Sequence, residues 1–312
     1  MEELNGILIL NKPAGFTSHD CIMKVRKILR MKKVGHTGTL DPNVTGVLPI
    51  CLGKATRVAE YITDVGKEYV GEVTLGWSTT TEDPSGETVA TKKVDRAITR
   101  EEILSVLQSL TGKIVQTPPI YSAVKVNGKR LYEYARQGLS VDIPSREVNI
   151  YEVELLDDRD IFEGEHISFS FRVSCGKGTY IRTLSVMIGE KLGYPAHMSK
   201  LVRTRSASFQ IDDALTLDNL AEHAANGTVQ TVLKPIEQAI DHLPQIIIND
   251  TLMKKVQNGM VLPVEELLVD NGIQPEDGPF AVLNDRGHLL AIYQYHPNKV
   301  GLCKPVKVIP QI

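Results

Sequence analysis

Long apolar runs are absent from this sequence of 312 residues, which nowhere approaches the roughly 20 consecutive apolar residues that a membrane helix needs. The first residues also lack the basic and then apolar pattern of a secretory signal peptide. From these two absences we expect a cytoplasmic protein that does not engage a membrane.

Cysteine is scarce, and the four cysteines are scattered without a C-x-x-C pair. They are Cys21, Cys51, Cys175 and Cys303. This spacing suggests neither a disulfide framework nor a tetrahedral zinc site. We therefore expect the cysteines to pack in the core, and we expect no bound metal. There is also no fixed-period repeat and no low-complexity segment, which argues against a fibrous or disordered chain.

An excess of positive charge is missing as well, because the formal net charge is −3. The total argues against nucleic-acid binding through overall charge, but the charges are unevenly distributed. Residues 1–60 are rich in Lys and Arg, whereas residues 237–312 are acid-rich. Since salt confines an electrostatic field to about 10 Å, a local basic surface can still attract phosphates.

The spacing of apolar residues predicts a mixture of strands and helices. Alternation or short buried runs predict strands at 6–10, 69–75 and 167–173. Three-to-four spacing predicts helices at 21–29, 102–110 and 181–192, the first capped by Thr17 or Ser18 and the second opened by a Thr99-x-x-Glu102 capping box. A short helix is expected at 55–63, after a long ordered loop at 35–53.

From about residue 245 the sequence changes to short apolar runs separated by Gly, Pro and Asn, with a predicted hairpin turn at 284–287. The absence of regular strand–helix alternation points to an α+β fold with a mainly antiparallel sheet. We expect a catalytic domain at 1–240 and a small β-rich module at 245–312.

The run GHTGTLDP at residues 35–42 gathers glycines, small hydroxyls, an imidazole and a carboxylate. In a structural interpretation, Asp41-Pro42 simply starts a turn and the glycines permit positive φ. In a functional interpretation, the glycines let a substrate approach while the rigid proline directs Asp41 into a pocket. Spacing alone does not decide between them, but long ordered loops in compact domains tend to be functional.

The same run, continued by TGVLP at 45–49, resembles the signature loop of the TruB-type tRNA pseudouridine-55 synthases. Further matches are KP followed by Gly15, KEY at 67–69, YSAVK at 121–125, LYEYAR at 131–136 and residues 174–182. Together they span roughly residues 6–205. One departure is Val44, where the family usually has alanine, which is a conservative change.

The resemblance implies three catalytic residues. Asp41 matches the essential aspartate, and a carboxylate can act as nucleophile or as base when the glycosidic bond of uridine is broken and remade at C5. Arg182 matches its basic partner, since a guanidinium suits bidentate pairing. Tyr69 matches the tyrosine that stacks on the uracil. The structural alternatives are an exposed helical arginine for Arg182 and a sheet-core aromatic for Tyr69.

Four further positions match substrate-binding residues of the family. His36 corresponds to the histidine that inserts into the RNA loop near the flipped base, and Tyr180 and Leu201 correspond to pocket residues. Lys12, in the KP motif, is assigned to the same substrate-binding group. Each has a structural alternative, because a lone histidine is usually hydrogen-bonded in the fold and a tyrosine at a strand end is often structural.

No cofactor is expected, since the family chemistry needs none and CGKGT at 175–179 lacks the spacing of a phosphate-binding loop. Cations expected to bind RNA phosphates are Lys24, Lys27, Arg30, Lys32, Lys33, Lys125, Lys129, Arg130, Arg136, Lys200, Arg203 and Arg205. Any one of them could instead be a solvated side chain. A stacked base is out of reach, so the target uridine has to be flipped out of a loop.

The resemblance thus implies an α+β pseudouridine synthase that acts as a monomer on the T-stem-loop of tRNA, with a PUA-like RNA-binding module at its C-terminal end. Because residues 237–312 are acid-rich, we expect this module to add affinity through shape-specific contacts rather than through bulk attraction of phosphate. Two rivals are an RNA-binding module without catalysis, such as a tRNA chaperone, and a synthase for another RNA. The presence of Asp41, Tyr69 and Arg182 argues against a module without catalysis. Identifying the RNA that gains pseudouridine would distinguish a tRNA synthase from a synthase for another RNA.

Overall fold

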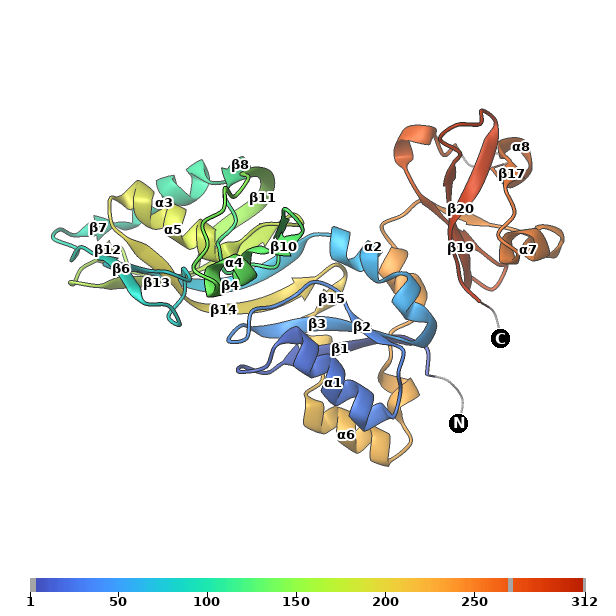
Figure 1. The fold of residues 1–312 in the computed structure, drawn as a ribbon, viewed down its shortest axis with the longest axis horizontal. Helices are drawn as coiled ribbons and strands as arrows, with labels where there is room; N and C mark the ends of the chain where they lie inside the picture. Colours follow the sequence, from blue (N-terminus) through green and yellow to red (C-terminus); the bar gives the residue numbers. More distant parts are fainter. Residues whose placement is uncertain (1–3, 269–271, 311–312) are drawn as a thin grey trace. The chain divides into compact units, whose positions relative to one another are not determined.

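The computed structural model describes residues 4–268 and 272–310. The chain forms two compact units that both mix helices with strands (Figure 1). Unit 1 consists of Met1–Pro42, Val47–Thr63 and Ala207–Ile312, and unit 2 of Asn43–Gly46 and Asp64–Ser206. The predicted α+β class is confirmed.

The first segments of unit 1 carry the motif-rich part of the sequence. Their elements are β1 (Gly6–Lys12), α1 (Ser18–Leu29), β2 (Val34–His36), β3 (Thr45–Leu52), η1 (Gly53–Arg57) and α2 (Ala59–Asp64). Strand β3 lies beside β1, and β2 pairs with β3 in an antiparallel arrangement. Helix α1 begins as predicted with Thr17 as its cap, whose hydroxyl accepts from the Asp20 amide while the Asp20 carboxylate accepts from the Thr17 amide.

The prediction of a loop throughout 35–53 is wrong for residues 45–52, which form β3. All residues from Gly46 to Leu52 are buried. A strand that is buried on both faces shows no alternation of polar and apolar residues, so its period could not be recognised. The loop that remains between β2 and β3 is 37–44.

Unit 2 is built on a mainly antiparallel sheet in which the neighbouring strands follow the order β14, β4, β13, β11 and β8. Their bounds are β4 (Lys67–Leu75), β8 (Gly112–Gln116), β11 (Arg146–Leu155), β13 (Ile167–Cys175) and β14 (Ala196–Ser206). Strand β14 also pairs in parallel with the first residues of β3. There a Cβ on Gly46, at φ +104, would lie 2.2 Å from the Arg203 carbonyl oxygen, so only glycine fits.

Two helices cover this sheet and confirm the predicted apolar faces. Helix α5 (Ile181–Leu192) packs on β14 and β4, and α3 (Arg100–Ser109) packs on β11 and beside α5. The capping box of Thr99 and Glu102 opens α3 as predicted. Short strand pairs complete the unit: β5 (Trp77–Thr79) with β6 (Thr88–Thr91), and β7 (Ile98–Thr99) with β12 (Ile161–Phe162).

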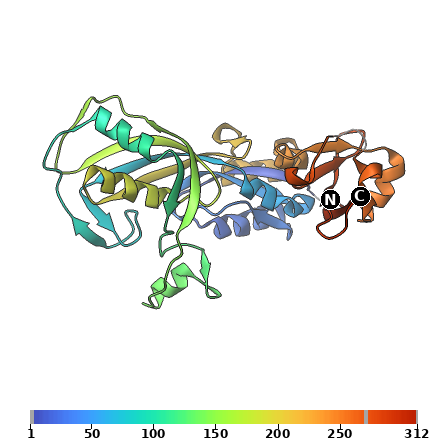
Figure 2. The same ribbon diagram turned by 90° about the horizontal axis from the view of Figure 1, so that it is seen from above.

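The connection between β8 and β11, residues 117–145, is here called the arm. It contains a small hairpin of β9 (Lys125–Val126) and β10 (Lys129–Arg130) followed by α4 (Leu131–Arg136). Figure 2 shows the arm in green, projecting away from the sheet of unit 2. Its basic residues Lys125, Lys129, Arg130 and Arg136 are all exposed.

Unit 1 continues after β14 with β15 (Phe209–Gln210), η2 (Ile211–Asp213), α6 (Leu217–Ala225), η3 (Val229–Val232) and η4 (Ile236–Ile240). This segment returns to the start of the chain. The amide of Ile7 donates to the carbonyl of Lys234, and the amide of Lys234 donates to the carbonyl of Ile7, both at 2.9 Å.

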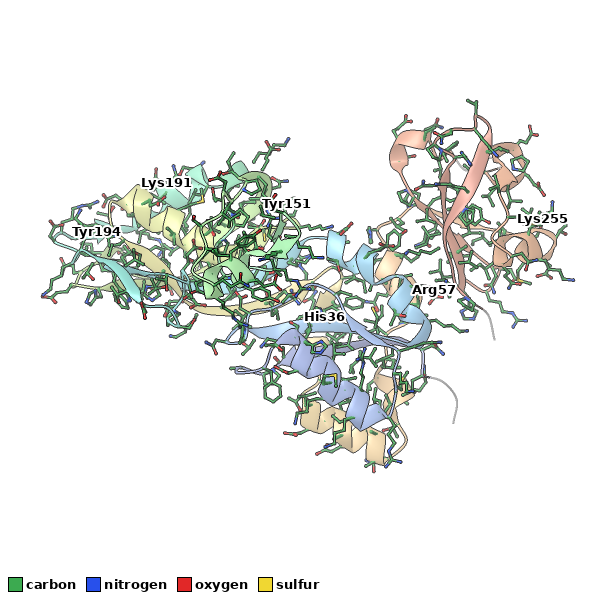
Figure 3. All side chains as sticks on the ribbon, in the orientation of Figure 1. His36, Arg57, Tyr151, Lys191, Tyr194 and Lys255 are labelled. Carbon is green, nitrogen blue, oxygen red and sulfur yellow. The ribbon has the colours of Figure 1, made fainter. Side chains whose placement is uncertain are left out.

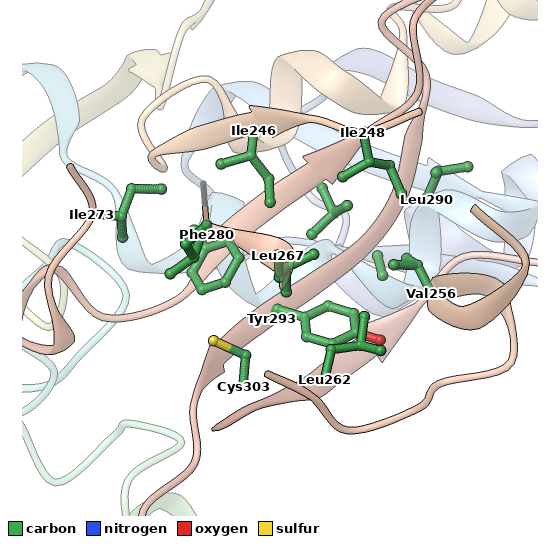
Figure 4. Close-up of a cluster of buried hydrophobic side chains, with 13 residues drawn as sticks. Ile246, Ile248, Val256, Leu262, Leu267, Ile273, Phe280, Leu290, Tyr293 and Cys303 are labelled. Atoms are coloured by element: carbon green, nitrogen blue, oxygen red, sulfur yellow. The ribbon is translucent and has the colours of Figure 1, made fainter. Parts of the chain in front are cut away.

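The last part of unit 1 is the predicted β-rich module. Its five strands follow the order β16 (Gln245–Ile247), β18 (Phe280–Leu283), β19 (Leu289–Tyr295), β20 (Leu302–Val308) and β17 (Leu262–Pro263). The helices are α7 (Asp250–Gln257), α8 (Val264–Leu267) and η5 (Pro275–Asp277). A hydrophobic cluster of its own, including Phe280 and Tyr293, fills the module (Figure 4). The predicted turn at 284–287 joins β18 to β19.

All four cysteines are buried free thiols, as predicted. Burial raises the pKa of Cys51 to about 12 and that of Cys175 to about 11, which makes these thiols poor nucleophiles. Among the described residues, no helix combines the length and the apolar character that crossing a membrane requires.

Candidate active site

Asp41 lies half-buried in the loop between β2 and β3, and both of its neighbours in the chain are anchored. Leu40 is buried, and its amide donates to the Ser18 hydroxyl at 2.9 Å. The carbonyl of Pro42 accepts from the Gly15 amide at 3.0 Å. The main chain around Asp41 is thus fixed by the start of α1 on one side and by the turn before α1 on the other.

Lys12 completes this anchoring from the end of β1. Its side chain is fully buried, and its ammonium donates to the carbonyls of Pro13 (2.9 Å), Phe16 (2.6 Å) and Pro42 (2.8 Å). An ammonium carries three N–H donors, and a buried charge is tolerated only with such partners. Lys12 therefore ties the residue after Asp41 to the turn that leads into α1.

The start of the Asp41 loop is held by the neighbouring strand. Thr37 is buried, and both its amide (3.1 Å) and its hydroxyl (3.4 Å) donate to the Pro49 carbonyl. His36 precedes it at the end of β2, opposite Ile50 on β3, and is half-buried (Figure 3). In unit 1, His36 and Asp41 therefore lie on one anchored stretch of chain, and Lys12 is one of the residues that anchor it.

In unit 2, Tyr69 and Leu201 share one face of the sheet. Tyr69 on β4 lies opposite Arg203 on β14, and Gly71 lies opposite Leu201, so the two side chains are diagonal neighbours. A Cβ on Gly71 would come within 3.2 Å of the Leu201 Cδ1 atom and 3.1 Å of the Phe171 ring. Glycine at this position lets Leu201 and Phe171 lie over the strand next to Tyr69.

Arg182 sits in the first turn of α5 with only 4% of its surface exposed, so its alternative interpretation as an exposed helical arginine is wrong. Its Nη1 donates to the carbonyl of Thr81 and its Nη2 to the carbonyl of Tyr121, both at 2.9 Å. These bonds hold the loop after β5 and the root of the arm against the helix. Tyr180, the N-cap of α5, is half-buried two residues earlier.

Of the predicted site residues, Lys12, His36 and Asp41 thus belong to unit 1, whereas Tyr69, Tyr180, Arg182 and Leu201 belong to unit 2. Within the described ranges, no group of three His, Cys, Asp or Glu side chains could hold a metal ion.

Comparison with known proteins identifies the family. Residues 26–181 match the N-terminal domain model of the TruB family pseudouridylate synthases, and residues 182–241 match the C-terminal domain model of tRNA pseudouridylate synthase B. The tRNA pseudouridine synthase B of Geobacillus thermodenitrificans is 57% identical over 305 residues, covering 98% of this chain and 99% of the relative. That of Bacillus cytotoxicus is 55% identical over 307 residues, covering 98% and 97%.

The chain belongs to the TruB family of pseudouridylate synthases. It is therefore an enzyme. Two solved structures share the fold of this TruB-family chain. One, described as a Cbf5-Nop10-Gar1 complex, has a TM-score of 0.73 and 31% identity over 98% of this chain and 84% of the other. The second is an H/ACA RNP bound to a substrate RNA containing 2'-deoxyuridine, with a TM-score of 0.72 and 30% identity over 98% and 85%.

Sequence reasoning missed one acidic residue next to Arg182 in this TruB-family chain. Glu82 has a positive φ of 62°, and its carboxylate accepts from the Thr183 hydroxyl at 2.8 Å. Burial raises the pKa of the Glu82 carboxyl above its ordinary value, while the bond from Thr183 and the charge of Arg182 act in the opposite direction. A strained residue with such contacts points to a constrained position, and nothing in the local sequence reveals it.

Buried cations beside Tyr69 are a second feature that was missed. Arg203 is only 1% exposed, so the prediction that it binds RNA phosphates at the surface is wrong; its strand position turns it inward. Lys67 is 7% exposed and donates to the Val65 carbonyl at 2.6 Å. Burial, and after it the charge of Arg203, lower the pKa of Lys67 to about 8.

Proposed function

We propose that this TruB-family enzyme converts uridine 55 in the T-loop of tRNA to pseudouridine, with Asp41 as its essential carboxylate. The observation that carries the proposal is the 57% identity to a tRNA pseudouridine synthase B across nearly the whole of both chains. The anchoring of Asp41 through Leu40 and Pro42 supports a role that demands a fixed position.

The reaction breaks the bond between N1 of uracil and C1' of the ribose, turns the base and forms a bond between C5 and C1'. The proton on C5 is then lost and N1 gains one, so the product is an isomer of the substrate. A carboxylate can attack the sugar as a nucleophile or withdraw a proton as a base. Asp41 takes one of these two roles in the proposal.

The other predicted site residues have proposed roles around that carboxylate. Arg182 supplies the cationic partner, and Tyr69 stacks on the uracil, with Leu201 as the adjoining apolar wall. Tyr180 lines the pocket, and His36 occupies the place that the flipped base leaves. Lys12 serves the substrate through the Asp41 loop, which is consistent with its three bonds to main-chain carbonyls.

Two exposed basic surfaces are the proposed contacts for the tRNA backbone. On α1 and the turn after it, the exposed cations are Lys24, Lys27, Arg30, Lys32 and Lys33. On the arm they are Lys125, Lys129, Arg130 and Arg136. Cations of this kind gain affinity by releasing counterions from phosphates. The unstacking of the target uridine costs a few kcal/mol, and stacking on an aromatic ring returns about 1–3 kcal/mol.

The β-rich module is proposed to be PUA-like and to contact the acceptor end of tRNA through a surface of complementary shape. Because residues 245–312 hold 7 acidic and 6 basic side chains, the module lacks the net positive charge that bulk attraction of phosphate requires.

The experiment that tests the proposal is incubation of the purified protein with unmodified tRNA transcripts, followed by mapping of pseudouridine at every uridine. We expect modification at position 55 alone, and none with the Asp41→Asn variant. A transcript with cytidine at position 55 is the matched control and should remain unmodified. Pseudouridine at another position, or in another RNA only, would contradict the proposed specificity.

A further inference from the structure

A cross-strand pair at the ends of β8 and β11 has no part in the chemistry described so far. Gln116 and Arg146 lie directly opposite each other in the antiparallel register. Both direct their polar groups to the same short segment, Gly178 to Tyr180, which leads into α5.

Gln116 binds the main chain of Tyr180 at two points. Its side-chain oxygen accepts from the Tyr180 amide at 3.0 Å, and its side-chain nitrogen donates to the Tyr180 carbonyl at 3.2 Å. The Gln116 side chain is 1% exposed, so water does not compete for these bonds. Gln116 therefore holds Tyr180 in the way that a neighbouring strand would.

Arg146 binds the ring of Tyr180 and the turn before it. The guanidinium carbon lies 5.1 Å from the centre of the Tyr180 ring, within cation–π distance. Nη2 donates to the Gly178 carbonyl at 2.6 Å. Gly178 has a φ of +88°, and a Cβ there would approach the guanidinium carbon to 3.3 Å, so glycine makes room for the arginine.

The Nε of Arg146 is buried and has no hydrogen-bond partner among the described residues. An unpaired buried N–H costs stability, and native proteins rarely leave one without a reason. The guanidinium is therefore placed to contact the Tyr180 ring and the Gly178 carbonyl, although this position leaves one of its N–H groups without a partner among the described residues.

We propose that Gln116 and Arg146 are positioning residues, which together fix the Tyr180 ring at the angle that the flipped uracil requires. Gln116 fixes the main chain of Tyr180 and Arg146 fixes its ring. The inference rests on the proposed function, because it assumes that Tyr180 lines the substrate pocket.

Tyr180 needs such support because its own element does not supply it. As the N-cap of α5 it makes no side-chain capping bond, and it follows a turn that contains two glycines, Gly176 and Gly178. A misplacement of about 1 Å in a reacting assembly can cost on the order of 100-fold in rate. A planar guanidinium on the ring restricts the orientation of the ring, whereas the compact ammonium of lysine would not.

The test compares Arg146→Lys with the wild type on an isolated T-stem-loop, in single-turnover rate and in Kd. Arg146→Lys keeps the charge and loses the planar contact, so we expect the rate to fall about 10-fold and Kd to change less than about 2-fold. Gln116→Met, which is similar in size but lacks the two hydrogen bonds, should show the same signature. Arg172→Lys is the matched control, because Arg172 is an exposed arginine on β13 paired with Glu154.

A double-mutant cycle separates positioning from a general structural effect. In a Tyr180→Leu background, Arg146→Lys should cause no further loss of rate, because the ring that it positions is gone. Circular dichroism melting of each variant establishes that the compared proteins are folded.

Several outcomes would overturn the inference. One is a wild-type rate for both Arg146→Lys and Gln116→Met. Another is a loss of rate from Arg146→Lys that is as large in the Tyr180→Leu background as in the wild type. A third is a raised Kd of Arg146→Lys with a weaker salt dependence and an unchanged rate, which would make Arg146 a phosphate-binding residue. If instead the wild type leaves the T-stem-loop unmodified, the proposed function itself fails and the inference fails with it.

Discussion

At the scale of single residues, Asp41 is held by its neighbours rather than by a regular element. Leu40 and Pro42 are anchored to Ser18, Gly15 and Lys12, so the carboxylate is carried on a rigid piece of main chain. An aspartate placed in this way loses little entropy when a substrate arrives, which favours the role proposed for it.

Replacing Asp41 by asparagine tests the carboxylate without altering its size. We expect Asp41→Asn to abolish turnover, because an amide is neither a nucleophile nor a base of useful strength. The Kd for tRNA should stay within about 2-fold, since the phosphate contacts are untouched. Filter binding and tritium release from labelled uridine measure the two quantities. A turning-over Asn variant would remove Asp41 from the mechanism.

Lys12 offers a prediction about stability. Lys12→Met removes an ammonium that is bonded to three main-chain carbonyls, and it deprives the Asp41 loop of one of its anchors. We expect the free energy of unfolding to fall by about 2–4 kcal/mol, because three partly buried hydrogen bonds to main-chain carbonyls are lost together. The rate should fall as well, even at temperatures where the variant is fully folded.

Urea denaturation measures the stability of Lys12→Met, and Lys191→Met is its control, because Lys191 is exposed on α5 and lies outside both proposed basic surfaces. A variant as stable and as active as Lys191→Met would show that the Asp41 loop holds its shape without Lys12.

Glu82 gives a prediction about pH. Because burial raises the pKa of Glu82 above its ordinary value of 4.5, the folded protein binds this proton more tightly than the unfolded chain does. The stabilising contribution of that proton is complete below pH 4.5 and is lost as the pH rises through the raised pKa. Glu82→Gln stays neutral and can still accept from Thr183. It should therefore match the wild type in stability below pH 4.5 and exceed it at neutral pH.

Chemical denaturation at acidic and neutral pH checks the prediction for Glu82, with Glu87→Gln as a control on an exposed carboxylate of the same loop. If Glu82→Gln were the less stable protein at neutral pH, the attraction of Arg182 would outweigh the cost of burial.

The sequence allowed prediction of residues that act with their neighbours in the chain. It gave no indication of contacts between residues that are far apart in the chain. The run at 35–42 marked the Asp41 loop directly. Glu82 and Thr183 are 101 positions apart, and Gln116 and Tyr180 are 64 apart. No local pattern links such residues, so their contacts emerge only when the sheet is assembled.

At the scale of elements, α1 and α3 were predictable because one face is buried and the other is largely exposed, which imposes a period on the sequence. In β4 most buried residues alternate with half-buried ones, and in α5 the apolar residues recur at three-to-four spacing. Strand β3 was not predictable for the opposite reason, since it is buried on both faces. The arm has few buried residues, and its role was indicated only by its resemblance to family motifs and by its cations.

The arm should contribute to the salt dependence of tRNA binding. Replacing Lys125 and Lys129 by alanine removes two exposed cations. If both contact phosphates, the slope of log K against log salt should decrease in magnitude by about 1.4–1.8, because each contact contributes about 0.7–0.9. Lys93→Ala is the control, since Lys93 is exposed but paired with Glu165. An unchanged slope would place the arm away from the RNA backbone.

At the scale of the whole molecule, the module after residue 244 has its own hydrophobic cluster. Its bonds to earlier parts of unit 1 include the Leu289 amide donating to the Glu237 carboxylate at 2.8 Å, Arg57 donating to the Val308 carbonyl at 3.0 Å, and the ion pair of Lys307 with Glu60 at 3.1 Å. A chain that ends after Asp241 retains the bonds between Ile7 and Lys234.

We expect this shortened chain to modify a T-stem-loop about as fast as the full chain and to bind full-length tRNA several-fold more weakly. The removed module is proposed to meet only the acceptor end, which the stem-loop lacks. A chain ending after Asn226, which loses Lys234, serves as the control and should lose much of its structure by circular dichroism. If the first chain is folded but inactive on the stem-loop, the module takes part in building the site.

The bonds between Ile7 and Lys234 also determine the order in which the protein can fold during synthesis. Unit 2 is almost contiguous, so its sheet can form once residues up to 206 have left the ribosome. Unit 1 cannot be completed then, because β1 pairs early with β3 but bonds to Lys234 only when that residue is translated much later. Contacts of such high sequence separation are slow to form and leave apolar strands exposed meanwhile. The local bonds of the Asp41 loop can thus form early, whereas the unit that carries this loop is closed only after Lys234 has been translated.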